Sequence, residues 1–453
     1  MPLFLQPDVD VVARNDNLFL ERKHIGVSHV LGVAEAIALK WLASTGTIEG
    51  AVAGCASYVP NADAWVRRTV DRYWTYLGEG PSREVDLKSL IDLATARPRF
   101  SILPQSNIRQ EAAPSSITWM VTLGCNRRCP YCFFRVYHFQ TGSTMSPPDA
   151  TFPLPNAVNM VQEMASIGAA DLYLTGGEPF LRVDLPEIIS EASRVRVRTH
   201  AVTKYPMSGE FARRLADSGI SSITVSLDDD RPREAAALAG APGYLDEARD
   251  TITALLNAGV PVDVNAVVTK VNAGRLRELA ICVHQLGVKR LKLSPFHSPY
   301  PPRPAAEKLT ARLDLQMEVD RLRDSEGTNG LEIVIGEGAD ASSDRKCSAP
   351  FVCEIGTRSL DVLPDGSVSR CHYLTDVPEM RIGTLRDQTI LNVWNSSFLR
   401  SMTRPDRSAF SGTSCFSCGQ HDGCNSRGRC YVSALQQTGS LHAPDAFCTR
   451  SDA

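Results

Sequence analysis

Three cysteines lie close together in the first third of the chain, at Cys125, Cys129 and Cys132. A closed structural zinc site would need a fourth ligand. Three thiolates can instead bind three irons of a four-iron cluster, and the fourth iron then stays open to the amino and carboxylate groups of a small molecule. The spacing Cys-x3-Cys-x2-Cys therefore indicates a reactive iron–sulfur cluster rather than a structural metal site.

An apolar run at residues 171–175 ends in Gly176, Gly177, Glu178 and Pro179. Glycine lets a backbone approach a ligand closely because it has no Cβ atom. A carboxylate at the C-terminal end of a strand lies where parallel sheets and barrels bind their ligands. This segment therefore predicts a ligand site at the end of a strand.

Further apolar runs typical of strands lie at residues 195–203, 223–228, 262–269 and 288–293. Helical stretches of roughly 10 to 20 residues separate them. Strands that alternate with helices in this way form parallel βα units. We expect a helix over 305–324 and a strand over 331–335 to connect this core to the C-terminal region.

The two motifs together resemble those of the radical S-adenosylmethionine (radical SAM) family. The resemblance implies an α/β fold, with a partial (β/α)6 barrel over residues 116–340. It implies that Cys125, Cys129 and Cys132 hold a [4Fe–4S] cluster that reductively cleaves SAM. It also implies SAM contacts from Gly176, Gly177, Glu178, Pro179, Thr203, Ser226, Asn265 and Tyr131. Thr203, Ser226 and Asn265 have a second interpretation, as ordinary turn and cap residues. Lys204 and Tyr205 stand where many relatives carry Asn and Gly.

Eight further cysteines fall in the last quarter of the chain, enough for two sites of four thiolates each. They are Cys347, Cys353, Cys371, Cys415, Cys418, Cys424, Cys430 and Cys448. Thiolates are soft ligands that select zinc or iron–sulfur clusters. Gly366 lies in a Leu-Pro-Asp-Gly turn between two short apolar runs, at 359–363 and 367–371.

This order of cysteines closely resembles the SPASM domain of radical SAM enzymes, which would occupy residues 341–453. The resemblance implies an inner auxiliary cluster on Cys347, Cys353, Cys371 and Cys430. It implies an outer auxiliary cluster on Cys415, Cys418, Cys424 and Cys448, and thus three [4Fe–4S] clusters in all. The alternative is a pair of structural zinc sites.

Composition limits the class of protein. The chain has 453 residues and a net charge of −3, so its bulk charge shows no nucleic-acid footprint. No apolar run reaches the ~18 residues of a membrane span, and no secretory signal pattern is found. Thirteen cysteines in a long chain of this kind indicate metal binding or redox chemistry rather than disulfides. We therefore expect a cytoplasmic enzyme without a nucleic-acid or membrane partner.

The first 84 residues share none of this chemistry. Apolar runs around an Asn/Asp turn near residue 16 and over 25–31 predict three strands, and helical patterns follow at 33–43, 48–58 and 64–77. Such a unit resembles the PqqD-like recognition domain, which binds the leader of a precursor peptide as an added strand. The alternative is a winged-helix-like packing domain or an oligomerisation cap. A proline-bearing linker is expected over residues 85–115.

The resemblances imply a radical SAM maturase that installs a crosslink, as a thioether, carbon–carbon or carbon–oxygen bond, in a ribosomally made peptide. An electron donor such as flavodoxin or ferredoxin is implied as a second partner. Crosslinking also releases a proton, for which His372, Asp376 and Tyr373 are candidate acid/base residues. The alternatives are an enzyme that oxidises a small molecule or a protein side chain, as in sulfatase maturation, a peptide epimerase, and a non-catalytic metal scaffold.

Overall fold

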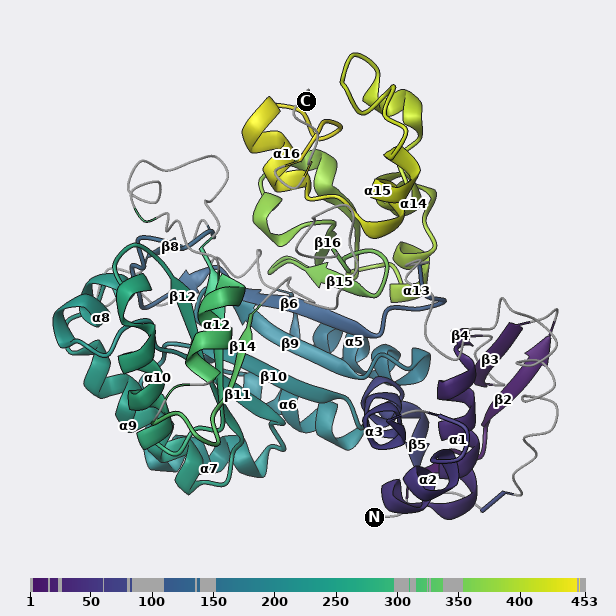
Figure 1. Ribbon diagram of the computed structural model, residues 1–453, viewed down its shortest axis with the longest axis horizontal. Coiled ribbons are helices and arrows are strands. Elements are labelled where there is room, and N and C mark those ends of the chain that lie inside the picture. The colour runs from purple at the N-terminus through teal and green to yellow at the C-terminus, as the bar shows by residue number, and fades with distance from the viewer. Residues whose placement is uncertain are drawn as a thin grey trace.

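The structure is a computed structural model (Figure 1). It describes residues 3–14, 17–22, 27–59, 61–79, 82–83, 110–134, 137–138, 152–296, 309, 315–323, 325, 327–336, 353–445 and 448. Cys347 and most of the expected linker lie outside these residues. Within the described part of the chain, no helix is long and apolar enough to cross a membrane.

A parallel sheet forms the centre of the described structure. Its strands, each hydrogen-bonded in parallel to the next, are β6 (Ser116–Thr122), β9 (Asp171–Gly176), β10 (Arg198–Thr203), β11 (Ser222–Ser226), β12 (Val262–Val268), β13 (Arg290–Pro295) and β14 (Glu332–Ile335). The first six are the strands of the expected partial barrel. The segment expected to lead toward the C-terminal region, β14, instead pairs with β13 and extends the barrel sheet.

The helices that connect these strands are amphipathic. They are α5 (Leu154–Ile167), α6 (Leu185–Arg194), α7 (Gly209–Asp217), α8 (Pro232–Ala239), α9 (Tyr244–Asn257), α10 (Leu276–Gln285) and α12 (Leu315–Arg323). In α6, the apolar residues Leu185, Ile188, Ile189 and Ala192 recur at the spacing of one helix face, and all four are buried. Their burial fixes the helix against the sheet and leaves the strand ends to form the site.

The C-terminal region adds strands to the other side of the same sheet. These are β15 (Ser359–Val362), β16 (Ser367–Ser369) and β17 (Arg381–Thr384). β15 pairs in parallel with β6, so the described strands form one ten-stranded sheet that crosses both regions. Gly366 forms the expected turn before β16, with φ of +84°, and a Cβ there would lie 2.4 Å from the ring of Phe152. Only glycine fits this turn.

Four short helices complete the C-terminal region, which lies above the sheet in Figure 1. They are α13 (Ile390–Trp394), α14 (Ser397–Thr403), α15 (His421–Arg427) and α16 (Tyr431–Thr438). The buried side chain of Trp394 anchors the first of them, since its Nε1 donates to the carbonyl of Glu111 at 2.7 Å. Glu111 lies just before β6, so this bond ties the region to the start of the barrel.

The N-terminal region contains the expected three strands and three helices. They are β2 (Val9–Arg14), β3 (Asn17–Arg22), β4 (Val27–Leu31), α1 (Val33–Thr45), α2 (Ile48–Cys55) and α3 (Ala62–Arg72). The sheet order is β2-β3-β4, and every pairing is antiparallel. A small strand pair that the sequence did not indicate, β1 (Phe4–Leu5) with β5 (Leu77–Gly78), ties the first residues to the end of this region.

The N-terminal region docks on the barrel at the edge where the parallel strands begin. Tyr76 Oη donates to the carbonyl of Ile167 at 2.9 Å, and Arg22 Nη1 donates to the carbonyl of Ala165 at 2.7 Å. Both acceptors end α5, just before β9. Arg198, the first residue of β10, forms a 3.1 Å ion pair with Asp71. The three strands therefore lie at the opposite end of the barrel from the cysteine loop, as Figure 1 shows.

Candidate active site and cluster sites

The three cysteines of the first motif lie on the loop that follows β6, at the C-terminal edge of the parallel sheet. Gly124 and Cys125 form a short strand, β7 (Gly124–Cys125), which pairs with β8 (Tyr137–His138). The pKa of Cys125 is raised to about 12. Burial is the main cause, and the charges of Cys129 and Cys132 contribute in the same direction. The three thiols therefore lie within electrostatic reach of one another.

This donor set fits an iron–sulfur cluster. Buried thiols are poor anions by themselves, because desolvation also raises the pKa of Cys129, to about 11. Bound metal supplies the positive charge that keeps such thiols deprotonated. Among the described residues, no group of three or more His, Cys, Asp or Glu side chains is arranged to bind a single metal ion. A four-iron cluster binds each thiolate at a different iron, so its ligands stand farther apart.

The Gly-Gly-Glu segment is packed on the cysteine loop backbone to backbone. Gly177 N donates to the carbonyl of Thr122 at 2.7 Å, and Glu178 N donates to the carbonyl of Gly124 at 2.8 Å. Gly176 has φ of +121°, and a Cβ there would lie 2.5 Å from the carbonyl oxygen of Thr122. Among the described residues, the close neighbours of Gly176 and Gly177 are thus backbone atoms of Thr122 and Gly124. The expected contact of these glycines with SAM stays a prediction.

The carboxylate of Glu178 joins the ends of β9 and β10. It accepts hydrogen bonds from Thr203 Oγ1 at 2.7 Å, from Lys204 N at 3.0 Å and from Phe180 N at 3.3 Å. Burial raises its pKa to about 7, and these hydrogen bonds act in the opposite direction. Both carboxylate oxygens therefore already have protein donors, and Glu178 and Thr203 act as one unit. Pro179 begins a 3-10 turn directly after it, η3 (Pro179–Leu181), and Pro179 and Phe180 are buried.

A buried ion pair that the sequence did not reveal lies next to the cysteine loop. Lys204 Nζ lies 2.8 Å from Asp228 Oδ2, and the same oxygen accepts from Tyr131 Oη at 2.5 Å. The second carboxylate oxygen of Asp228 accepts from Val267 N at 2.9 Å. Tyr131 stands between Cys129 and Cys132, so this network fixes the loop to β11 and β12. Tyr131 therefore holds the cysteine loop in place through the hydrogen bond of its hydroxyl group to Asp228.

Ser226 and Asn265 lie side by side at the same edge. They are partners in the parallel pairing of β11 with β12. Asn265 Oδ1 accepts from Ser294 Oγ at 2.7 Å, and the carbonyl of Ser226 accepts from Lys204 Nζ at 3.4 Å. Thr203 and Ser226 are thus the last residues of β10 and β11, while Asn265 lies beside Ser226 in the middle of β12.

The residues expected to hold the inner auxiliary cluster also come together where they are described. Burial raises the pKa of Cys371 well above its usual range, and the nearby charges of Cys353 and Cys430 raise it further. Their sequence separation is large, so only the fold brings them near one another. The fourth expected ligand, Cys347, lies outside the described residues.

The outer group is arranged around short loops. Cys418 N donates to the carbonyl of Cys415 at 3.2 Å, and Gln420 N donates to Cys418 Sγ at 3.4 Å. Asp445 links the last cysteine to the inner group, because its carbonyl accepts from Cys448 N at 3.0 Å and its Oδ2 accepts from Cys430 N at 3.1 Å. Backbone N–H groups directed at sulfur are typical of iron–sulfur sites. Cys424 lies in α15.

Phe133 connects the cysteine loop to the segment after Cys371. Its ring centroid lies 4.2 Å from that of Tyr373 and 5.6 Å from that of His372. His372 Nδ1 lies 2.8 Å from Asp361 Oδ2, and Asp361 is buried on β15. Asp376 is exposed. Of the three acid/base candidates, the structure therefore gives His372 a carboxylate partner that the sequence analysis did not include.

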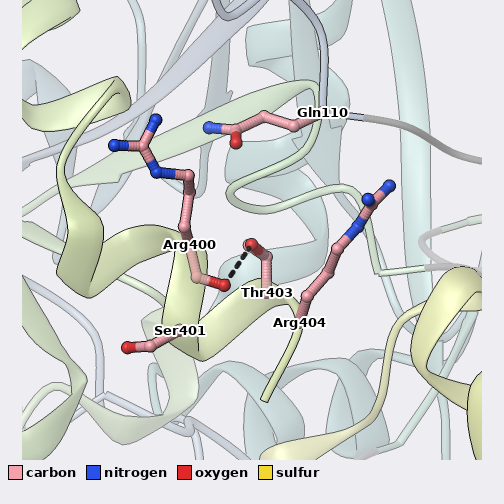
Figure 2. Close-up of a pocket in the computed structure, with 5 residues that line it drawn as sticks. All are labelled: Gln110, Arg400, Ser401, Thr403 and Arg404. Carbon is pink, nitrogen blue, oxygen red and sulfur yellow. Dashed lines mark hydrogen bonds between the residues drawn. The ribbon is translucent and has the colours of Figure 1, made fainter. Parts of the chain in front are cut away.

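A hollow of about 460 Å³ lies elsewhere, between α14 and the residues before β6. Figure 2 shows its lining residues, Gln110, Arg400, Ser401, Thr403 and Arg404. Gln110 Nε2 donates to the carbonyl of Trp394 at 2.8 Å, so Gln110 links the segment before β6 to the end of α13. The lining contains neither the cysteines nor the strand-end residues. The hollow is therefore separate from the site described above.

Two family models match the chain. The radical SAM superfamily matches residues 119–280, and the iron–sulfur cluster-binding SPASM domain matches residues 353–419. Among curated proteins, the chain is similar to the PqqA peptide cyclase of Methylocella silvestris, with 28% identity over 354 residues, 74% of this chain and 87% of the relative. It is also similar to the PqqA peptide cyclase of Xanthomonas oryzae pv. oryzae, with 25% identity, 75% of this chain and 89% of the relative.

Solved structures show the same fold. Streptococcus suis SuiB bound to the precursor peptide SuiA matches with a TM-score of 0.63 and 17% identity, over 99% of this chain and 100% of that one. The structure named anSMEcpe, with bound AdoMet and the Cp18Cys peptide, matches with a TM-score of 0.53 and 16% identity, over 74% of this chain and 94% of that one. The first match extends over the N-terminal region as well as the barrel.

Proposed function

Since the chain is a radical SAM enzyme with a SPASM domain, we propose that it installs an oxidative crosslink in a ribosomally made precursor peptide. The bond would be a thioether, a carbon–carbon or a carbon–oxygen bond. The relatives named as PqqA peptide cyclases support a peptide substrate. The likeness to SuiB, solved with its precursor peptide, supports an architecture that accommodates one.

The contact between Phe133 and the ring pair His372 and Tyr373 is the observation that carries this proposal. Phe133 follows Cys132, and His372 follows Cys371, so the contact brings the radical-forming loop next to the inner auxiliary site. A substrate held here is within reach of both. Oxidative crosslinking needs such an arrangement, because hydrogen removal and electron removal must act on the same bound peptide.

We assign one [4Fe–4S] cluster to each of the three cysteine groups. The inner auxiliary cluster would include Cys347, and the outer one would include Cys424. Cys125, Cys129 and Cys132 would hold the open-iron cluster, which together with SAM would supply the radical chemistry that removes one hydrogen atom from the peptide. The residues of the chain position this chemistry. Glu178, Thr203, Ser226 and Asn265 shape the strand ends beside SAM, while Lys204, Asp228 and Tyr131 hold the cysteine loop. An electron carrier such as flavodoxin or ferredoxin would provide the reducing electron.

His372 would take the proton that leaves the peptide when the crosslink forms. The product would lose two hydrogens, one as an atom and one as a proton held by His372, and a cluster held by the inner cysteine group would supply the acceptor for the remaining electron. The Asp361 carboxylate at 2.8 Å orients the imidazole and stabilises the imidazolium that results. Asp361 is a positioning residue, since it acts through His372. Tyr373 packs beside the ring and helps to fix its plane.

The N-terminal region would bind the leader of the precursor through the β4 edge of its sheet. The other edge, on β2, is already used by the chain. Val9 N donates to the carbonyl of Gln6 at 3.0 Å, Arg83 Nη1 donates to the carbonyl of Val9 at 2.8 Å, and Val11 N donates to Asp10 Oδ1 at 2.9 Å. Antiparallel strands alternate their hydrogen-bonding directions. By the register of β2, β3 and β4, Ser28 and Val30 then direct their backbone groups outward.

Incubation with the precursor encoded beside the gene tests the function. Reconstituted enzyme, SAM and dithionite should yield a peptide lighter by two hydrogens, with one crosslink found by tandem mass spectrometry. Loss of the product in the Cys125→Ala, Cys129→Ala, Cys132→Ala triple variant is the control. A product of unchanged mass that gains one deuterium in D2O would instead identify an epimerase. No change to any peptide would favour the small-molecule alternative.

The substitution Ser28→Pro tests the leader site, because it removes an outward N–H while an edge strand tolerates proline there. We expect weaker binding of a labelled leader, measured by fluorescence polarisation, with SAM cleavage unchanged. Ser28→Ala keeps the N–H and is the matched control. Equal leader affinity in both variants would place leader recognition elsewhere.

A further inference from the structure

Arg370 is a buried cation that has no carboxylate partner among the described residues. Its side chain is among the largest that are fully enclosed, with an exposed fraction of 2%. Among the described residues, it forms no salt bridge with an aspartate or a glutamate, and its Nε has no hydrogen-bond partner. A guanidinium in such a place is costly unless an anion compensates its charge.

The neighbours of Arg370 are the thiols of the inner auxiliary site. Its Nη1 donates to Cys353 Sγ at 3.1 Å, and its own backbone leads directly into Cys371. The ring of Tyr431 closes the other side, with its centroid 5.5 Å from the Arg370 Cζ. Among the described residues, the groups beside this cation that would become anionic on binding a cluster are therefore the cysteine thiols of the inner site.

Arg429 repeats this arrangement at the outer site. Its Nη1 donates to Cys415 Sγ at 3.5 Å, and its guanidinium lies over the ring of Phe410 at 4.3 Å. Arg429 is also buried, with an exposed fraction of 8%. Like Arg370, it directly precedes a cysteine of the inner group, in this case Cys430. In the described part of the chain, Arg370 thus contacts the inner cysteine group and Arg429 contacts the outer one.

We propose that Arg370 and Arg429 are the charge partners of the inner and outer auxiliary clusters, and that each raises the reduction potential of its own cluster. This inference rests on the auxiliary clusters of the proposed function. A reduced cluster carries one more negative charge than an oxidised one. A fixed cation beside it stabilises the reduced state more, and it does so strongly in a buried setting. Hydrogen bonds to cluster sulfurs act in the same direction.

The effect of Arg370 should be the larger of the two. Its hydrogen bond to sulfur is shorter, and its side chain is more deeply buried. The inner auxiliary site would then accept an electron from the bound peptide more readily than the outer one. Arg370 is a positioning residue in this sense, since it acts through the cluster and touches no substrate.

Redox titration of the full-length reconstituted enzyme, followed by EPR, tests the proposal. Arg370→Gln keeps a hydrogen-bond donor but removes the charge. We expect a tenfold or larger loss in the equilibrium constant for reduction of one cluster, which is about 59 mV for a one-electron couple. Arg429→Gln should shift a different cluster signal and by less. Arg370→Lys keeps the charge and should restore part of the shift.

Iron content and the number of EPR-active clusters must match wild type in each variant, which separates this test from the cluster assignment itself. Fewer than three clusters in the wild-type enzyme would refute the proposed function. Three clusters with unchanged potentials in Arg370→Gln would refute the role of the arginine and leave the function standing. Arg370→Lys also serves as the second variant if Arg370→Gln does not fold. If the reduction potential of the cluster is as low in Arg370→Lys as in Arg370→Gln, the electrostatic role of Arg370 is contradicted.

Discussion

Gly177 lies so close to Gly124 that a Cβ on residue 177 would stand 2.0 Å from the Gly124 carbonyl oxygen. The strand end that precedes Glu178 and the loop that carries the first cysteine therefore touch through backbone atoms alone. Their relative position requires that residue 177 has no side chain. The cysteine loop and the proposed SAM site at this edge of the sheet both depend on that position.

The substitution Gly177→Ala should impair SAM cleavage by displacing the cysteine loop. Overpacking costs about 1–3 kcal/mol, and here the obstructing atom is backbone that cannot rotate away. We expect the rate of 5′-deoxyadenosine formation to fall by about tenfold or more. Gly274→Ala is the matched control, because a Cβ at that position meets no atom within 4 Å. Equal rates in the two variants would show that the contact does not matter for the loop.

The substitution His372→Ala should separate hydrogen removal from product formation. Deuterium should still move from labelled peptide into 5′-deoxyadenosine, while crosslink formation falls by roughly 10²-fold through loss of the base. Asp361→Asn should give a smaller loss and a changed pH profile of product formation, because it removes the partner of the imidazole. The exposed Asp376 provides the control as Asp376→Asn. Full product yield in His372→Ala, with intact cluster spectra, would assign the proton to another group.

The distance between leader site and chemistry predicts a minimum spacer in the precursor. The N-terminal region docks where β10 begins, and the cysteine loop lies where the strands end. The six residues of β10 span roughly 20 Å. An extended peptide covers about 3.3–3.6 Å per residue, so roughly six residues are needed.

Precursors with shorter spacers should bind with unchanged affinity and remain unmodified, as measured by fluorescence polarisation and mass spectrometry. Deletion of the same number of residues beyond the modified site is the control and should have little effect. Wild-type modification with a two-residue spacer would mean that leader and core do not bind to one enzyme at the two sites proposed.

Acid should loosen the N-terminal region through His29. Its Nε2 lies 2.9 Å from Tyr76 Oη, the group that also holds Ile167, and burial lowers the pKa of His29 to about 4. The unfolded value is 6.5. The folded state therefore favours neutral His29, and this stabilisation is present above pH 6.5 and lost as the pH falls toward 4. Its size is on the order of 3 kcal/mol.

Hydrogen–deuterium exchange of β2 to β4 measures this effect without requiring the whole chain to unfold in one step. Protection should fall between pH 6.5 and 4 in the wild type. In His29→Gln, which has no titrating group at this position, protection should change less over the same range. Identical pH dependence in both proteins would exclude His29 as the cause.

Local patterns were sufficient to predict most strands of the parallel sheet. The run predicted at 262–269 forms β12 over Val262–Val268, because alternating burial and β-branched residues specify such a strand locally. The Lys204–Asp228–Tyr131 network could not be predicted, since Tyr131 and Asp228 are 97 residues apart and meet only through the barrel. Arg370 was visible beside Cys371, but its contact with Cys353 depends on how β15 and β16 are placed.

The parallel pairing of β15 with β6 has a consequence for the order of folding during synthesis. Ser116 pairs with Ser359, so one edge of β6 has no partner until most of the chain has left the ribosome. Long-range strand pairing of this kind is slow, and an open strand edge invites association with other chains. The nascent barrel therefore depends on a region that is made well after it, and removal of residues 353–453 would leave an aggregation-prone edge rather than an independent barrel domain.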